Sequence, residues 1–180
     1  AAQVEATRTA LGIPAAEKYE PTGGAYLKDA FALLKHRSAN PLEDQLKLWD
    51  LTVFNFLIGN TDNHLKNLSL LYDASLASVR LAPAYDVIST TVYPGSTRDL
   101  SMRIGDAVTV DDVSESSFRM AACEVGIGEK LAIKRFSAMA QQFEAALTST
   151  AEELTGKGFT NAAQLREQIL LTGGYRHINK

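Results

Sequence analysis

The chain has 180 residues, of which 46% are hydrophobic and 22% are charged, and its formal net charge is −3. This balance disfavours a generally basic nucleic-acid binder, and a single cysteine cannot build a disulfide framework. The longest strongly apolar stretch, Leu51–Ile58, is far too short to span a bilayer, and no signal-peptide pattern is visible at the start. We therefore expect a cytoplasmic protein that does not enter a membrane, with residues 1–180 forming one domain around one core.

The first predicted elements are helices. A short helix is expected to end within Ala6–Leu11, where Gly12 and Pro14 stop it. After a loop, apolar residues recur at helical spacing over Tyr26–His36 and predict a second helix.

The third predicted helix has the clearest boundaries. Asn40 can cap it, Pro41 suits its first position, and Glu43 completes a capping-box arrangement. Gly59 is expected to end it. Its second half, Val53–Ile58 (VFNFLI), is apolar almost all round, so we expect it to be buried on every side.

The middle of the chain changes to short apolar segments separated by turn residues. Leu68–Tyr72 and Arg80–Ala82 predict one hairpin. Leu100–Ile104 and Val108–Val110 predict a second strand pair around a glycine turn.

Helical spacing returns in the last third of the chain. Asp112 and Glu115 resemble a capping pair at the start of a helix, and longer helices are predicted over Glu129–Leu154 and Thr160–Leu171. Cys123 lies on an apolar helix face and is expected to be a small core residue. The predicted fold class is therefore α+β, mainly α, with short antiparallel hairpins.

A polar cluster lies where the third helix is predicted to end. The segment Gly59–Asn67 reads GNTDNHLKN, and Asp86 follows just beyond a predicted strand, in LAPAYDV. Asp62 and Asn67 are five residues apart in a turn, so both side chains can face one pocket, which Asp86 can reach from the strand end. Loops at the ends of rigid elements are where reactive groups are usually displayed.

These side chains suit a magnesium ion that arrives with a nucleotide. A carboxylate and an amide oxygen are hard ligands, but alone they form a weak cage, so phosphate and water would supply the remaining ligands. Asp62 would then be spare to orient a hydroxyl nucleophile and accept its proton. Lys66 could add positive charge toward a transferring phosphoryl group.

Each of these residues also has a simpler interpretation. Asp62 and Asn67 belong to the residue types that most often form turns. His64 could be a hydrogen-bonded structural histidine, Lys66 a solvated surface charge, and Tyr85 a core residue.

The spacing of the polar residues follows a known order. Protein kinases place a catalytic-loop Asp five residues before a metal-binding Asn, and a second metal-binding Asp on the next hairpin. Here, GNTDNHLKN followed by LAPAYDVIST resembles the C-terminal lobe of HipA-like serine/threonine kinases, the toxins of bacterial HipBA-type toxin–antitoxin modules. The upstream stretch ALGIPAAEKYEPTGG is similar to the same family, so the resemblance covers most of the chain.

The resemblance implies a role for each matching residue. Asp62 falls on the catalytic base, and Asn67 and Asp86 fall on the magnesium ligands. The segments that line the nucleotide in this family include three further positions: His64, Lys66 and Tyr85. The resemblance also implies ATP and Mg²⁺ as cofactors, a protein substrate of the aminoacyl-tRNA synthetase class, and a small DNA-binding antitoxin that would tether the kinase to DNA indirectly.

Two parts that a kinase requires are missing from this sequence. A kinase needs a glycine-rich loop over the phosphates and a lysine on a strand of its N-lobe. Neither pattern is present among the 180 residues. We therefore expect a C-terminal lobe that is largely inactive alone. We favour a fragment of a longer kinase over an N-lobe supplied by a separate polypeptide.

Three other functions remain open from the sequence. The chain could be a non-catalytic module that docks an antitoxin or a substrate protein. A metal-dependent phosphoesterase could use Asp62, His64 and Asp86, although no second histidine or bridging carboxylate supports it. Ser116–Phe136 reads as helix, glycine turn and helix, as a DNA-binding module does, but acidic residues dilute its positive charge.

Overall fold

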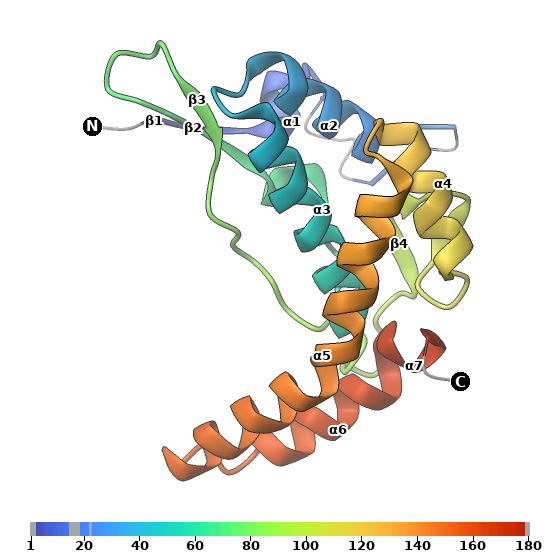
Figure 1. The fold of residues 1–180 in the computed structure, drawn as a ribbon. Helices are drawn as coiled ribbons and strands as arrows, with labels where there is room; N and C mark the ends of the chain where they lie inside the picture. The colour runs from blue at the N-terminus through green and yellow to red at the C-terminus, as the bar shows by residue number, and fades with distance from the viewer. Residues whose placement is uncertain (1–2, 15–18, 22, 179–180) are drawn as a thin grey trace.

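The helix Pro41–Ile58 (α3) lies at the centre of the structure. The computed structural model describes residues 3–14, 19–21 and 23–178, and in it α3 packs against Tyr26–Arg37 (α2) and Glu129–Gly156 (α5) (Figure 1). Trp49 of α3 is fully buried, and its indole N–H donates to the Ala132 carbonyl of α5 at 3.0 Å. The apolar spacing that predicted α2, α3 and α5 thus marks the faces that meet in the core.

The apolar second half of α3 is buried with one exception. Within Val53–Ile58, every side chain is buried except that of Phe54, which is 38% exposed and meets the ring of Phe143 edge-on. The prediction of burial on every side is therefore confirmed for most of this segment and wrong for Phe54. Phe54 packs against Phe143 at the edge of the core and not inside it.

The start of α3 differs from the predicted capping box. Asn40 occupies the N-cap position and Pro41 follows it, but the Asn40 side chain caps no backbone N–H. Its amide nitrogen instead donates to Glu43 at 3.2 Å, and its backbone N–H donates to Ser38 Oγ at 3.0 Å. Side-chain hydrogen bonds of this kind compete with the cap for the same groups.

A three-stranded antiparallel sheet forms in the order β1-β2-β3. Its members are Gln3–Ala6 (β1), Ser69–Tyr72 (β2) and Val79–Leu81 (β3), and the helix Thr7–Ala10 (α1) follows β1 directly. The predicted hairpin of β2 and β3 is confirmed, whereas β1 was not predicted. Four residues carry too little periodicity to identify a strand, and β1 is held by pairing with a segment far along the chain.

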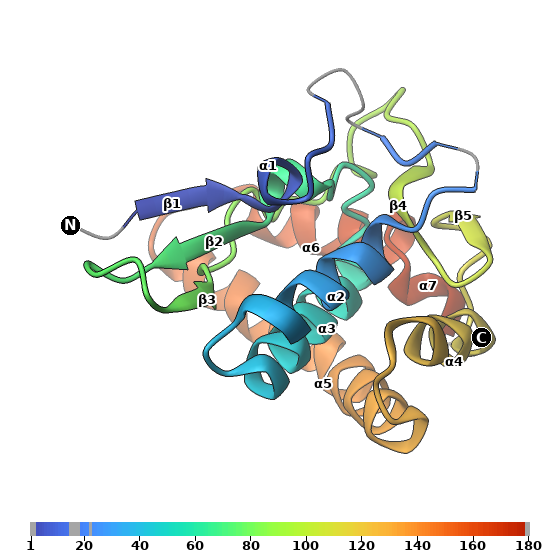
Figure 2. The ribbon, with the colours of Figure 1, turned by 90° about the horizontal axis from the view of Figure 1, so that it is seen from above.

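The second predicted strand pair is also confirmed. Asp99–Ile104 (β4) pairs antiparallel with Ala107–Thr109 (β5), and Gly105 lies at the turn with φ of 59°. Seen from above, the two sheets lie on opposite sides of the central helices (Figure 2). The fold is thus the mainly helical α+β arrangement that the sequence predicted.

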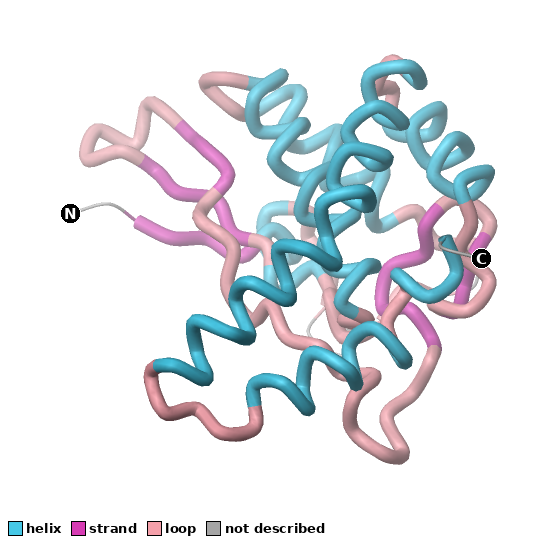
Figure 3. Tube along the Cα trace, turned by 60° about the horizontal axis from the view of Figure 1, so that its bottom comes forward, coloured by secondary structure: helices cyan, strands magenta, loops and turns pink. Residues whose placement is uncertain are grey.

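The last third of the chain is helical. Its elements are Glu115–Val125 (α4), α5, Ala162–Thr172 (α6) and Tyr175–Ile178 (α7). The helices α5 and α6 pack side by side and extend away from the rest of the molecule (Figure 3). Among the described residues, no helix combines the length and the apolar composition needed to cross a membrane.

Two residue-level predictions in this region were wrong. The N-cap of α4 is Ser114, which exchanges hydrogen bonds with Ser117, whereas Asp112 accepts from the Thr109 hydroxyl. Cys123 is exposed, not part of the core. Its neighbours Ala121 and Ala122 are fully buried, so the core-facing stripe of α4 passes beside Cys123 and leaves its thiol outside.

Candidate active site

The backbone around Gly59 anchors the loop that carries the candidate residues. Gly59 ends α3 with φ of 74°, and its carbonyl accepts from the N–H groups of Thr90 and Thr91, both at 3.1 Å. The N–H of Thr61 donates to Thr90 Oγ1 at 2.9 Å. The segment that leaves β3 therefore returns along this loop and brings Asp86 to it.

Asp62 and Asn67 lie in one closed turn. The short 3₁₀ helix Leu65–Asn67 (η1) ends the turn, the Asn67 N–H donates to the His64 carbonyl at 2.8 Å, and Asn67 Nδ2 donates to the Asp62 carbonyl at 3.2 Å. Asn67 is 8% exposed and Asp62 is half-buried. Because the amide nitrogen of Asn67 faces the Asp62 backbone, its carboxamide oxygen points the other way. The structure thus brings these two predicted residues together.

Asp86 lies beside the same loop, but not on a strand. It follows β3 in an extended segment, its side chain is exposed, and its backbone is left-handed with φ of 56°. Its carbonyl accepts from Asn60 Nδ2 at 3.3 Å. The three oxygen-bearing residues predicted to share a pocket therefore come from two segments that the structure joins.

Tyr85 connects the segment that contains Asp86 to the end of the loop near Lys66. Its hydroxyl group lies 2.8 Å from Ser69 Oγ and donates to the Lys66 carbonyl. Tyr85 is 45% exposed, so the interpretation as a core residue is wrong. Of the remaining predicted residues, Lys66 is half-buried and His64 is only 6% exposed.

Sequence reasoning did not single out two residues that contact the site. Tyr19 donates from its hydroxyl to Asp62 Oδ1 at 3.3 Å, and the Asn60 side chain touches both halves of the site. Both residues lie inside the stretches that resemble the HipA-like family. Their contacts join positions far apart in the chain, which local spacing does not reveal.

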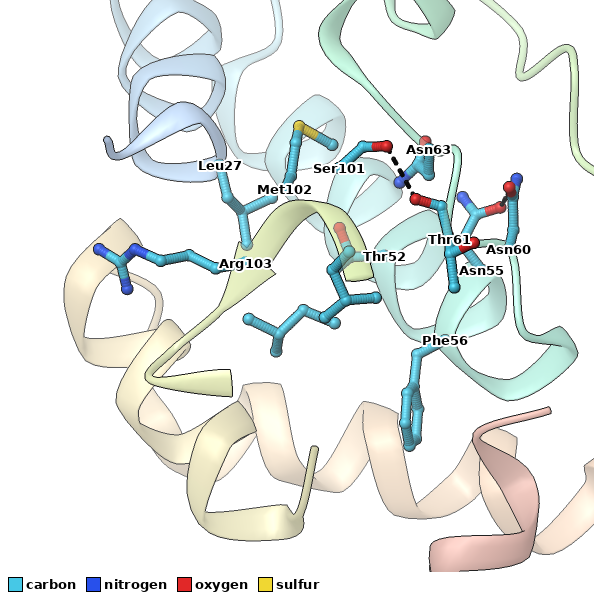
Figure 4. Close-up of a pocket in the computed structure, with 12 residues that line it drawn as sticks. Leu27, Thr52, Asn55, Phe56, Asn60, Thr61, Asn63, Ser101, Met102 and Arg103 are labelled. Atoms are coloured by element: carbon cyan, nitrogen blue, oxygen red, sulfur yellow. Dashed lines mark hydrogen bonds between the residues drawn. The ribbon is translucent and has the colours of Figure 1, made fainter. Parts of the chain in front are cut away.

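One cavity lies against the loop, and another lies beside Tyr19. The smaller one has a volume of about 20 Å³, lies behind the loop among Thr52, Asn55 and Thr61, and has room for roughly one water molecule (Figure 4). The larger one has a volume of about 680 Å³ and opens beside Tyr19, between Glu20 and β4. The larger of these two cavities has room for part of a substrate, and Tyr19, which lines it, donates to Asp62.

Glu20 holds the wall of the larger cavity against β4. Its carboxylate accepts from the N–H of Tyr26 at 3.0 Å and from the N–H of Arg103 at 2.8 Å. Burial raises the pKa of Glu20 above its ordinary value, although these hydrogen bonds and the Arg103 charge oppose that rise. Glu20 therefore acts as a tether of this wall and is not a free acid in the cavity.

Two side chains of the site carry oxygen donors of the kind that Mg²⁺ prefers. Asn67 offers a carboxamide oxygen and Asp86 an exposed carboxylate, both of which are hard ligands. Within the part of the chain that the structure describes, no three His, Cys, Asp or Glu side chains converge to hold a metal ion.

Comparison with known proteins identifies the family. A family model described as the HipA-like C-terminal domain matches residues 2–147. The chain belongs to this family. Among curated relatives, Y4mE of Sinorhizobium fredii, which is named as an inferred kinase, is 38% identical over 144 residues, covering 80% of this chain and 34% of Y4mE.

HipA itself is a further relative. HipA of Shewanella oneidensis, named a serine/threonine-protein kinase toxin, is 30% identical over 130 residues, covering 66% of this chain and 29% of HipA. A solved structure of Shewanella oneidensis HipA with HipB and its operator DNA superimposes with a TM-score of 0.82 at 21% identity, covering 98% of this chain and 43% of that one. The HipA-like fold is thus confirmed, and the chain spans about a third of the length of these two curated relatives.

Proposed function

We propose that this chain is the C-terminal catalytic lobe of a HipA-like serine/threonine protein kinase. The proposal rests on the hydrogen bonds that bring the backbone of Asp86 to the loop of Asp62 and Asn67, in a family whose relatives include named kinases. The reaction is transfer of the γ-phosphoryl group of ATP to a protein hydroxyl. In this proposal residues 1–180 form one lobe, and another part of the enzyme covers the nucleotide phosphates.

Each residue has a role that follows from its chemistry. The Asp62 carboxylate accepts the proton of the acceptor hydroxyl, and the Tyr19 hydroxyl gives way to that group when a substrate binds. Asn67 and Asp86 hold Mg²⁺, which neutralises phosphate charge when it is bound. Lys66 and His64 lie on the same loop, where positive charge or a hydrogen bond would position phosphate.

Tyr85 has a positioning role in this scheme. Its hydroxyl fixes the backbone of Lys66 to the segment that contains Asp86, while its exposed ring faces outward. The ring is therefore the part of Tyr85 that a nucleotide could contact.

The biological setting follows from the relatives. The similarity to a HipA that was solved with HipB and operator DNA supports a role as toxin in a toxin–antitoxin pair. The partner would be a small DNA-binding antitoxin, with DNA contacted only through it. The substrate would be a protein of the aminoacyl-tRNA synthetase class.

The test is Asp62→Asn in an enzyme that contains this lobe together with its nucleotide-clamping part. The variant keeps the shape and hydrogen bonds of the loop but removes the base, so kcat should fall by roughly 10² to 10⁴ with an unchanged melting temperature. Transfer of labelled phosphate from ATP measures kcat. Asp106→Asn, which changes an exposed aspartate in the β4–β5 turn, is the matched control and should leave kcat unchanged. Near-normal turnover of Asp62→Asn would remove Asp62 from its role.

A further inference from the structure

A single buried carboxamide connects the halves of the candidate site. Asn60 is 4% exposed and lies directly beside Asn55 of α3 (Figure 4). Its Nδ2 donates to Asn55 Oδ1 at 2.8 Å and to the Asp86 carbonyl at 3.3 Å, and its Oδ1 accepts from the Asp62 N–H at 3.2 Å. Both ends of the Asn60 amide are therefore used, and they join α3, the loop and the segment beyond β3.

The hydrogen bond from Asn60 reaches Asp86 at a position where the backbone is left-handed. Residues other than glycine adopt a φ of 56° infrequently, although aspartate does so more readily than most, and the surroundings must hold such a conformation in place. The hydrogen bond from Asn60 to the Asp86 carbonyl helps to hold this backbone conformation. A change at Asn60 should therefore be felt at Asp86, 26 residues along the chain.

The other contact of Asn60 fixes the loop. The bond from the Asp62 N–H to Asn60 Oδ1 closes a tight turn directly after α3. On its inner side Asn60 is held twice by Asn55, through the side-chain bond and through its own N–H, which donates to the Asn55 carbonyl at 2.8 Å. These hydrogen bonds fix the position of the loop relative to the core helix α3.

We propose that Asn60 is a positioning residue that sets the placement of the Asp62 loop relative to Asp86. This role rests on the proposed kinase function, because only there do Asp62 and Asp86 act on the same substrate and nucleotide. Asn60 itself is buried behind both residues and touches neither ligand. A catalytic geometry is lost when its members shift by a fraction of an ångström, so a residue that fixes two of them affects turnover without taking part in the chemistry.

Two alanine variants separate this role from simple packing. Asn55→Ala and Asn60→Ala both remove the Asn55–Asn60 side-chain bond and both leave a small buried space. Only Asn60→Ala also removes the contacts with Asp62 and Asp86. If Asn60→Ala does not fold, Asn60→Ser replaces it, since its hydroxyl is too short to join all three partners.

The first measurement is hydrogen exchange of the chain without nucleotide or metal. Both variants should lower the melting temperature by similar amounts, but only Asn60→Ala should speed exchange in residues 82–91, by about tenfold for roughly 1.4 kcal/mol of lost hydrogen bonding. Equal exchange of this segment in the two variants would overturn the proposal.

The second measurement is binding of ATP with Mg²⁺ by the enzyme that contains both lobes. Asn60→Ala should weaken it about tenfold more than Asn55→Ala, with the excess growing as Mg²⁺ becomes limiting. Parallel losses in the two variants would also overturn the proposal. If the unaltered enzyme binds no ATP, the kinase function fails, while the exchange data still decide whether Asn60 positions Asp86.

Discussion

Two effects, backbone conformation and close packing, both favour glycine at position 59. Its φ of 74° lies in the left-handed region, where a side chain costs about 1–2 kcal/mol. A Cβ at this position would also overlap Thr91 Oγ1 and lie 2.9 Å from the Gly173 Cα atom. Gly59 therefore lets the loop leave α3 and lets two distant segments approach it.

The chain offers a control that separates these two effects. Gly126 ends α4 with φ of 75°, and a Cβ there would meet no atom within 4 Å. We expect Gly126→Ala to lower the free energy of unfolding by about 1 kcal/mol, and Gly59→Ala to lower it by about 3 kcal/mol because of the added overlap. Urea unfolding measures both. Equal losses would mean that Thr91 and Gly173 move aside at little cost.

The sequence predicted individual residues unevenly, for a physical reason. Gly59 was predicted to end α3, because helix termination depends on neighbouring residues alone. The contacts of Asn60 and Tyr19 were not predicted, since their hydrogen-bond partners lie far along the chain. Cys123 was placed in the core because the rotation of α4 against its neighbours could not be read from spacing to within one residue.

At the scale of elements, Asp44 joins the first turn of α3 to β3. Its side chain is fully buried, and it accepts from Ser38 Oγ at 2.6 Å, from the Leu81 N–H at 2.8 Å and from the Arg80 guanidinium. Burial raises the pKa of Asp44, but the hydrogen bonds from Arg80, Ser38 and Leu81 together outweigh it and leave the pKa below its ordinary value. The charged form of Asp44 therefore stabilises the folded chain.

This direction of the pKa shift predicts an acid-dependent stability. The unfolded chain binds the proton more tightly, so the contribution of Asp44 is complete above its unfolded pKa of about 3.9 and is lost as the pH falls through the lower folded value. Asp44→Asn should lower the free energy of unfolding by about 3 kcal/mol near pH 7, and the difference should shrink below about pH 4. Urea unfolding at both pH values measures this.

Glu43 supplies the matched control for Asp44. It also pairs with Arg80, at 3.0 Å, but its side chain is about half exposed. Glu43→Gln should therefore change the stability far less than Asp44→Asn, because an exposed ion pair contributes little. A loss for Asp44→Asn that stays constant down to acid pH would contradict the role assigned to the Asp44 charge.

Helices and strands were predicted correctly where a long periodic pattern or local turn residues mark them in the sequence. The helices α2, α3, α5 and α6 and both hairpins follow from periodicity and turn residues, and all were found. The strand β1 and the helix α7 were missed, because each has four residues and depends on tertiary packing. Asn40 occupies the predicted N-cap position of α3, but the predicted capping partners were wrong in both helices. Ser38, and not Glu43, accepts from the Asn40 N–H, and Ser114, and not Asp112, caps α4.

At the scale of the whole molecule, the candidate site lies where the chain leaves the core. Its loop follows the buried helix α3, and the segment with Asp86 runs from the three-stranded sheet back to that loop. The backbone also ties β4 to the loop, since the Ser101 N–H donates to the Thr61 carbonyl at 2.9 Å. The helices thus form a rigid support, and the site consists of loops held against it.

This arrangement predicts how the isolated chain should behave. A kinase stabilises the transferring phosphoryl group with a glycine-rich loop and a strand lysine, and the 180 residues contain neither pattern. We therefore expect the purified chain to transfer little or no phosphate from ATP, and to become active only when a polypeptide that supplies those parts is present. Incorporation of labelled phosphate, with and without that polypeptide, measures this.

The same comparison discriminates between the enzyme and a docking module. A catalytic lobe should contribute to ATP binding with Mg²⁺ once its partner lobe is present, and the binding should weaken in an Asp86→Asn variant, because Asp86 supplies the charged ligand. A module that only docks proteins should leave ATP binding unchanged by Asp86→Asn. Strong ATP-dependent autophosphorylation by the 180-residue chain alone would contradict the dependence on a second lobe, since the phosphate clamp would then have to lie within these residues.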